Sequence, residues 1–139
     1  MKPDIATETE VIGVLERLCS AFADRDAEAV MCVLGANPDV VVVTSEAAVL
    51  RGPVELRGFV DRYVEGPTTY SWEWERYTVS TTGSVALLLA EGTETATTEA
   101  RLEQHPYRMT MVLARHEDRW LPAQVHGSSP HSGAIAPGA

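Results

Sequence analysis

Residues 70–95, YSWEWERYTVSTTGSVALLLAEGTET, decide the fold of this chain because their side chains alternate with the period of a β-strand. Aromatic residues occupy every second position at the start of the stretch, and polar residues lie between them, which predicts a half-buried strand. Gly83 predicts a turn into a second strand from Val85 to Thr95, and Gly92 inside that strand indicates a bulge or bend. The aromatic residues are Tyr70, Trp72 and Trp74.

The strand period continues to His126, and no helical pattern returns after Thr69. A long strand is predicted from Tyr107 to Arg115 and a last strand from Trp120 to His126, with a turn at Glu117 and Asp118 between them. Four strands in sequence predict an antiparallel meander.

Three helices are predicted before the meander. Thr7-x-x-Glu10 is typical of a capping box, Asp26 can cap a second helix that ends at Gly35, and Gly52-Pro53 opens a third that stops at Gly66-Pro67. Apolar residues follow each start at the spacing of one helix face.

A short hairpin of Val40–Val43 and Val49–Leu50 is predicted between the second and third helices. Helices followed by a bent sheet favour an α+β fold. We therefore expect a cone-shaped, curved antiparallel sheet wrapped around three N-terminal helices and enclosing one pocket.

Composition limits the class of protein. The chain has 139 residues, of which 45% are hydrophobic, and we expect a single domain over residues 7–129 with a flexible C-terminal tail over 130–139. Eleven basic and twenty acidic residues give a net charge of −9, which argues against nucleic acid as a partner. The longest apolar run, Val85–Ala90, is too short to cross a membrane, and the first residues lack the apolar segment of a secretory signal, so we expect a cytoplasmic protein.

The closing stretch RMTMVLARHEDRWLPAQVHGSSP, residues 108–130, resembles the final hairpin of the SnoaL-like branch of the nuclear transport factor 2-like superfamily. The residues that carry the resemblance are Arg108, Thr110, Trp120, His126 and Ser128. The resemblance implies a cone-shaped α+β barrel with one apolar pocket that is usually a homodimer through its sheet. Relatives include ketosteroid isomerases, polyketide cyclases and dehydratases.

Glu91 and His126 are the predicted catalytic residues. Glu91 continues the face of Val85 and Leu87, and a carboxyl group buried there would have a raised pKa suited to acid–base work. The alternative is that Glu91 turns to solvent or pairs with Arg108.

His126 can serve as acid or base near neutral pH, or it can hydrogen-bond structurally at the end of its strand. Its facing depends on the closing hairpin. A two- or four-residue turn places it with Met109 and Met111, whereas a three-residue turn places it beside Arg108 and Thr110.

Four residues are predicted to bind the ligand. Trp72 and Trp74 could line a pocket for a flat or apolar molecule, and Arg108 could stabilise an anion on it. Tyr63 could bring its hydroxyl group to the pocket mouth. Packing in the core, and for Tyr63 completion of its helix stripe, are the alternatives.

No metal site is expected, since only His126 and His131 are near each other in sequence and no Cys, Asp or Glu completes the set. No motif for a dinucleotide, a P-loop or a serine nucleophile occurs, so no cofactor is expected.

Two functions follow as hypotheses. The first is a cofactor-free pocket enzyme of isomerase, cyclase or dehydratase type, which acts on a small apolar or polycyclic metabolite. The second is a non-catalytic homodimer that binds a small ligand or a partner. A dimer through the sheet is also expected because the meander strands carry apolar residues on both faces, of which helices can cover one.

Overall fold

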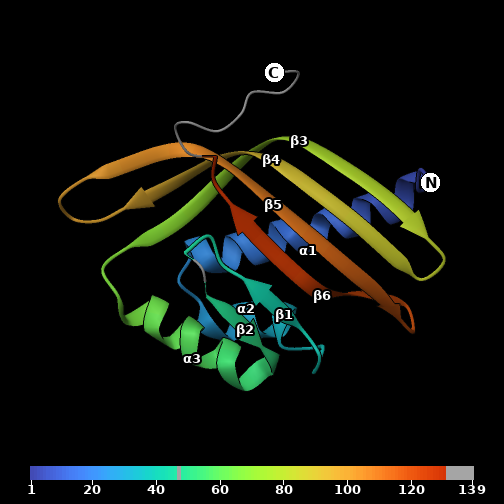
Figure 1. Ribbon diagram of the computed structural model, residues 1–139, viewed down its shortest axis with the longest axis horizontal. Helices are drawn as coiled ribbons and strands as arrows, with labels where there is room; N and C mark the ends of the chain where they lie inside the picture. Colours follow the sequence, from blue (N-terminus) through green and yellow to red (C-terminus); the bar gives the residue numbers. More distant parts are fainter. Residues whose placement is uncertain (47, 131–139) are drawn as a thin grey trace.

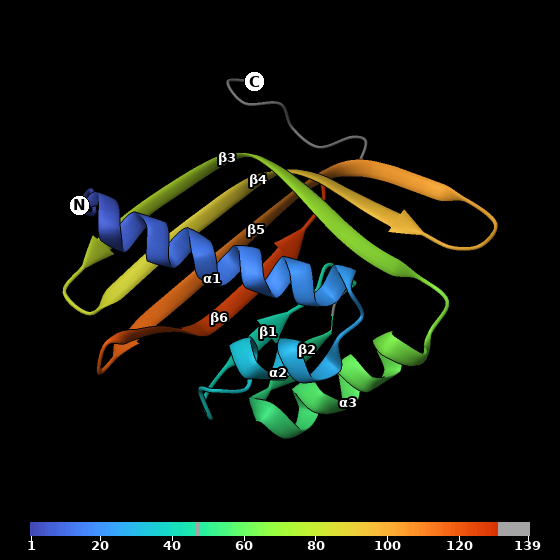
Figure 2. The same ribbon diagram turned by 180° about the vertical axis from the view of Figure 1, so that it is seen from behind.

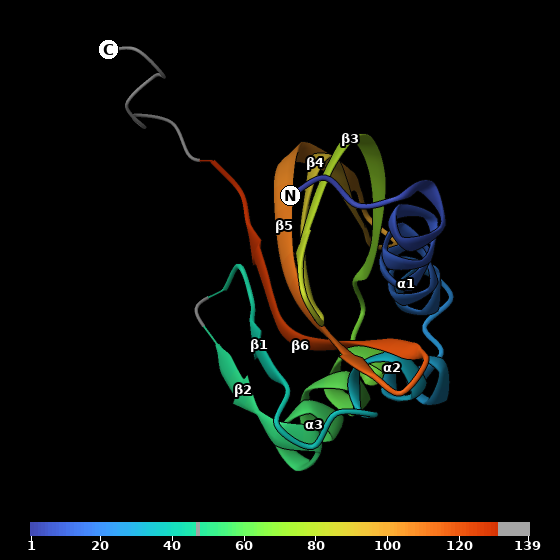
Figure 3. The same ribbon diagram turned by 90° about the vertical axis from the view of Figure 1, so that its right-hand side faces the viewer.

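The computed structural model describes residues 1–46 and 48–130. Three helices lie against one face of a curved, unclosed six-stranded sheet, which confirms the predicted α+β fold (Figures 1 and 3). Residues 131–139, and with them His131 and most of the predicted tail, lie outside the described residues. The helices are α1 (Ile5–Ala23), α2 (Ala27–Leu34) and α3 (Gly52–Glu65).

The strands follow the order β2-β1-β6-β5-β4-β3 across the sheet. The predicted meander of β3 to β6 is antiparallel throughout. The short β1–β2 hairpin adds to the free edge of β6, where β1 runs parallel and Val42 lies beside Val125. The sheet is therefore mixed rather than wholly antiparallel. The strands are β1 (Val41–Val43), β2 (Val49–Arg51), β3 (Thr69–Thr82), β4 (Val85–Thr97), β5 (Leu102–His116) and β6 (Arg119–Ser128).

Helix α1 crosses the concave side of the sheet and packs mainly on β3 (Figure 2). It begins three residues before the predicted capping box, because the Asp4 side chain accepts a hydrogen bond from the Thr7 amide at 2.7 Å. The predicted cap of α2 is confirmed, since the Asp26 carboxylate accepts from the Ala29 amide at 3.0 Å.

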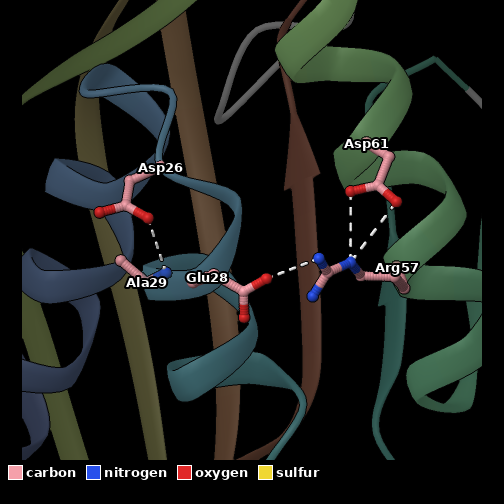
Figure 4. A network of polar contacts seen from close by, with 5 residues as sticks. All are labelled: Asp26, Glu28, Ala29, Arg57 and Asp61. Carbon is pink, nitrogen blue, oxygen red and sulfur yellow. Dashed lines mark hydrogen bonds and ion pairs between the residues drawn. The ribbon is translucent and has the colours of Figure 1, made fainter.

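An arginine on α3 joins α2 to α3 (Figure 4). The Arg57 guanidinium lies 2.6 Å from the Glu28 carboxylate on α2 and 3.2 Å from Asp61 one turn along its own helix. All three side chains are substantially exposed, so these ion pairs add little to the stability of the fold.

Strand β4 shows which side of the sheet is inside. Ala86, Leu88 and Ala90 are buried under the helices, whereas Val85 and Leu87 remain 38% and 51% exposed on the convex side. Because side chains alternate along a strand, the odd-numbered positions of this segment face outward and the even-numbered positions face the concave side.

A β-bulge bends the sheet beside Gly92. Glu75 on β3 is the extra residue, since Trp74 pairs with Gly92 and Arg76 pairs with Glu91. A Cβ atom at Gly92 would lie 2.0 Å from the Glu73 carbonyl oxygen, so only glycine allows this approach. The bend is thus where Gly92 predicts it, although the additional residue belongs to the neighbouring strand.

The hydrophobic core lies between α1, α2, α3 and the concave face of the sheet. Its fully buried residues come from all of these elements: Val11, Leu15, Leu18, Val30, Leu34, Leu56, Val60, Met111 and Leu113. No helix among the described residues is both long and apolar enough to pass through a lipid bilayer.

Candidate functional site

A cavity of about 300 Å³ opens beside the core, between the concave face of the sheet, α1, α3 and the loop after β1. Its walls are mostly apolar and include Leu18, Phe22, Leu56 and Phe59. Exposed residues such as Glu46 also line it, so the cavity reaches the surface. A small apolar cavity with a few polar groups is the usual form of a ligand site.

Glu94 on β4 is the buried acidic residue of this cavity, with 5% of its surface exposed. One carboxylate oxygen accepts a hydrogen bond from the Trp72 indole N–H at 2.9 Å, and the other lies 2.9 Å from Nε2 of His105. Burial raises the pKa of the Glu94 carboxyl group, and the Trp72 bond and the His105 charge offset part of that rise. A carboxyl group with a raised pKa keeps its proton to a higher pH than an exposed glutamate does, and it can act as an acid or a base.

The pairing of β3, β4 and β5 brings the side chains of Trp72, Glu94 and His105 together. Trp72, Glu94 and His105 occupy one row across β3, β4 and β5, so their side chains project from the same face of the sheet. The His105 side chain is 38% exposed and reaches solvent, whereas Glu94 is enclosed. The row therefore runs from the cavity to the protein surface.

Tyrosine hydroxyl groups form a second wall of the cavity. Tyr63 on α3 donates to the Phe22 carbonyl at 2.7 Å and accepts from the Tyr70 amide at 2.9 Å, while the Tyr70 hydroxyl group donates to Glu46 at 3.2 Å. Burial, followed by the negative charge of Glu46, raises the pKa of Tyr70 to about 12. Both phenols are therefore neutral donors at physiological pH.

Arg25 holds this wall in place. Its backbone is left-handed with φ 55°, and its guanidinium donates to the carbonyls of Val64, Gly66 and Thr68, the last at 2.8 Å. The guanidinium also lies 5.4 Å from the centre of the Tyr63 ring. The end of α3 and the start of β3 are thereby tied to the loop after α1.

Tyr107 on β5 lies across Gly127 of β6 and also lines the cavity. A Cβ atom at Gly127 would be 2.1 Å from the Tyr107 hydroxyl oxygen, so glycine is required for this placement. Burial raises the pKa of the Tyr107 hydroxyl group, and a hydrogen bond with the Ser45 side chain partly opposes that effect.

Two of the predicted ligand-binding residues line the cavity, namely Trp72 and Tyr63. Trp74 instead packs against the core, and its indole N–H is buried with no hydrogen-bond partner among the described residues. Arg108 is exposed on the convex side of β5.

His126 lies outside the cavity lining, and its side chain is exposed. The closing turn has two residues, which alone would place His126 with Met109, but Ala123 forms a bulge on β6 and shifts the register by one. His126 therefore pairs with Thr110 on the outer face. Of the two facings that the sequence left open, the structure shows the one beside Arg108 and Thr110, which places the predicted catalytic residue His126 outside the cavity.

Glu91 is also outside this cavity. It continues the face of Val85 and Leu87 as the sequence indicates, but that face is the convex one. Glu91 pairs across the sheet with Arg108 beside a shallow surface depression. Glu91 and His126, the two predicted catalytic residues, therefore do not meet in this cavity, and Glu94, three residues along from Glu91, takes the buried position.

The sequence carries a weak signal for Glu94. It lies two residues after Gly92 on the even-numbered face of β4, but both faces of that strand are apolar before Gly92. Only the location of the helices shows that the even-numbered face is the inner one.

A larger groove of about 710 Å³ runs between α1, α2 and the start of β6. Its charged residues, including Glu10, Arg17 and Arg119, are exposed, and it contains no enclosed titratable group. The smaller cavity, which contains the buried carboxyl group of Glu94, is therefore the better candidate for a catalytic site. No cluster of three potential metal ligands occurs among the described residues, and His131, the sequence neighbour of His126, lies outside them.

Fold and cavity together define a class, the cone-shaped α+β proteins whose curved sheet encloses a hollow against its helices. The SnoaL-like domain family matches residues 11–132, and the chain belongs to that family. No curated protein matches the sequence.

Solved structures of the nuclear transport factor 2-like superfamily share the fold. A candidate dehydratase from Streptomyces avermitilis has 19% identity and a TM-score of 0.81, covering 93% of this chain and 100% of its own. A candidate aromatic ring hydroxylase from Novosphingobium aromaticivorans has 16% identity and a TM-score of 0.83, with 94% and 93% covered. A superfamily protein from Salmonella enterica serovar Typhimurium has 14% identity and a TM-score of 0.80, with 96% and 98% covered. At these identities the likeness shows the fold alone.

Proposed function

We propose that this protein is a cofactor-free enzyme of isomerase, cyclase or dehydratase type that acts on a small apolar molecule in the 300 Å³ cavity. The observation that carries the proposal is Glu94, a carboxyl group with 5% exposure that lines this cavity. Burying a carboxyl group costs free energy, which the contacts with Trp72 and His105 offset only in part, and residues with such shifted pKa values cluster at functional sites.

Glu94 is the proposed proton-transfer group. As a carboxylate it removes a proton from a carbon next to a carbonyl group, and as a carboxylic acid it returns a proton to the product. The Trp72 indole N–H and His105 hold its two oxygens, which fixes the direction of the remaining lone pairs. Tyr107 supports the same chemistry, because a neutral phenol at the cavity wall can donate a hydrogen bond to the oxygen that gains charge.

A candidate dehydratase among the structural neighbours is compatible with proton-transfer chemistry on this fold. The fold by itself hosts several functions, so the proposal rests on Glu94 and not on the neighbour.

A binding protein of the same fold is the second candidate. Its supporting observation is that the polar groups of Tyr63 and Tyr70 are already bonded within the protein while much of the wall is apolar. In either case we propose a homodimer through the convex face, where Val85 and Leu87 are exposed.

Deuterium exchange separates the two candidates. The protein is incubated in D₂O with a panel of small cyclic ketones and enones, and loss of the proton next to the carbonyl is followed by NMR. An enzyme exchanges this proton above the buffer rate, and Glu94→Gln lowers the rate roughly 10²- to 10⁴-fold, the usual contribution of a positioned base.

Glu91→Gln is the matched control, since it removes a carboxylate from the outer face of the same strand. Equal loss in both variants would contradict a specific role for Glu94. Binding of panel compounds without exchange by the unmodified protein would favour the binding protein.

A further inference from the structure

The polar side chains around the cavity are nearly all engaged inside the protein. Tyr63 uses its hydroxyl group as donor and acceptor, Tyr70 donates to Glu46, and both oxygens of Glu94 have partners. The Thr44 hydroxyl group accepts from the Ala48 amide at 3.1 Å. A ligand that needs a new strong interaction must therefore find it elsewhere in the lining.

Arg62 is the exception among the charged side chains of the lining. It belongs to the last turn of α3, lines the cavity and is exposed to solvent. No hydrogen bond or ion pair joins its guanidinium to another residue in the part of the chain that the structure describes. The two other arginines near α3 are committed, Arg25 to backbone carbonyls and Arg57 to Glu28 and Asp61.

The charges around the cavity indicate which kind of ligand group Arg62 can bind. The chain carries a net charge of −9, which repels anions in general. At the cavity itself the acidic groups are Glu46, which accepts the Tyr70 hydroxyl group, and Glu94, whose burial favours its neutral form. Arg62 is the cationic side chain that lines the cavity, so it is the place where an anionic ligand group can be held.

We propose that Arg62 binds a carboxylate on the ligand, so that the ligand class is a small apolar acid whose ring lies in the cavity and whose carboxylate lies at the mouth. This inference rests on the proposed function, since it uses the same cavity. The planar guanidinium presents paired N–H donors that match the two oxygens of a carboxylate. The exposed carboxylate of Glu46, which also lines the cavity, repels a ligand carboxylate, so the attractive contact is with Arg62.

The probes are 1-naphthoate and its neutral counterpart 1-naphthamide, and binding is measured by calorimetry and by quenching of Trp fluorescence. We expect tighter binding of naphthoate. Arg62→Gln should weaken naphthoate binding about five- to tenfold and leave naphthamide unchanged, as expected for a partly exposed, charge-assisted pair. Arg62→Lys should restore part of the loss, because it keeps the charge without the paired donors.

Two further variants sharpen the result. Glu46→Gln should tighten naphthoate binding a few-fold by removing the nearby negative charge. Arg119→Gln, in the groove between α1, α2 and β6, alters the net charge equally and should change neither affinity.

Equal affinity for both probes, or the same loss in the Arg62 and Arg119 variants, would overturn the inference and leave the cavity and Glu94 proposal intact. Arg62-dependent naphthoate binding together with no Glu94-dependent proton exchange would uphold the inference and refute the enzyme. Failure of both probes to bind at millimolar concentration would overturn the inference.

Discussion

Replacing Glu94 with glutamine should change how the free energy of unfolding depends on pH. The unfolded carboxyl group has a pKa near 4.5, and burial raises the pKa of Glu94 in the folded protein. Between those two values the folded state holds a proton that the unfolded state has released, so stability falls as pH rises through this window. The favourable contribution of Glu94 is complete below the unfolded pKa and is lost above the folded one.

The magnitude follows from the contacts of Glu94. Each unit by which the folded pKa exceeds the unfolded pKa lowers the stability above the window by about 1.4 kcal/mol. Glutamine keeps an acceptor for the Trp72 N–H but carries no charge, so Glu94→Gln should match the unmodified protein at pH 4 and become more stable than it as the pH rises through the window. Glu94→Ala should be about 1–3 kcal/mol less stable than Glu94→Gln at every pH, because the Trp72 donor is left without its partner.

Urea unfolding at half-unit steps from pH 4 to pH 8 measures both effects, and the difference between variant and parent cancels the titrating groups that do not interact with Glu94. Glu94 is in direct contact with His105 and also feels the negative charge of Glu46. The variant His105→Gln is therefore included, to separate the effect of His105 on Glu94 from the effect of burial. Parallel pH profiles for Glu94→Gln and the parent would refute the raised pKa. If Glu94→Gln became less stable relative to the parent as the pH rises, the burial of a neutral carboxyl group at Glu94 would be refuted.

Three shorter predictions concern other parts of the fold. Burial raises the pKa of the Cys19 thiol to about 12, so a disulfide reagent at pH 8 should label exposed Cys32 quickly and Cys19 only after unfolding; two fast thiols would contradict this. Gly92→Ala should lower the melting temperature more than Gly127→Ala does, because the new methyl group at 92 meets backbone atoms, whereas the one at 127 meets the end of the Tyr107 side chain. The reverse order in a thermal melt would show that the bulge can relax. Leu87→Glu should leave the circular dichroism spectrum unchanged and convert a dimer to the 15.1 kDa monomer in sedimentation, and a monomeric parent would refute the convex interface.

The order of elements, the cap at Asp26 and the aromatic face of β3 were predictable because each depends on a few neighbouring residues. A capping side chain bonds to an amide three positions along, and strand alternation needs only the adjacent residues. Trp72 and Tyr63, which the same local patterns made candidates for ligand binding, both line the cavity. The first helix start was misplaced because Asp4 competes successfully with Thr7 as the cap.

The cavity carboxylate was decided by tertiary structure. Alternation divides β4 into two faces, but both are apolar before Gly92, so hydrophobicity alone could not choose between Glu91 and Glu94. The packing of α1, α2 and α3 made that choice. The position of His126 depended on one bulged residue, Ala123, whose effect exists only in the pairing of β6 with β5. Which face of a strand is buried, and which residues pair across two strands, depend on contacts between residues far apart in the chain. The site could therefore be identified only in the folded structure.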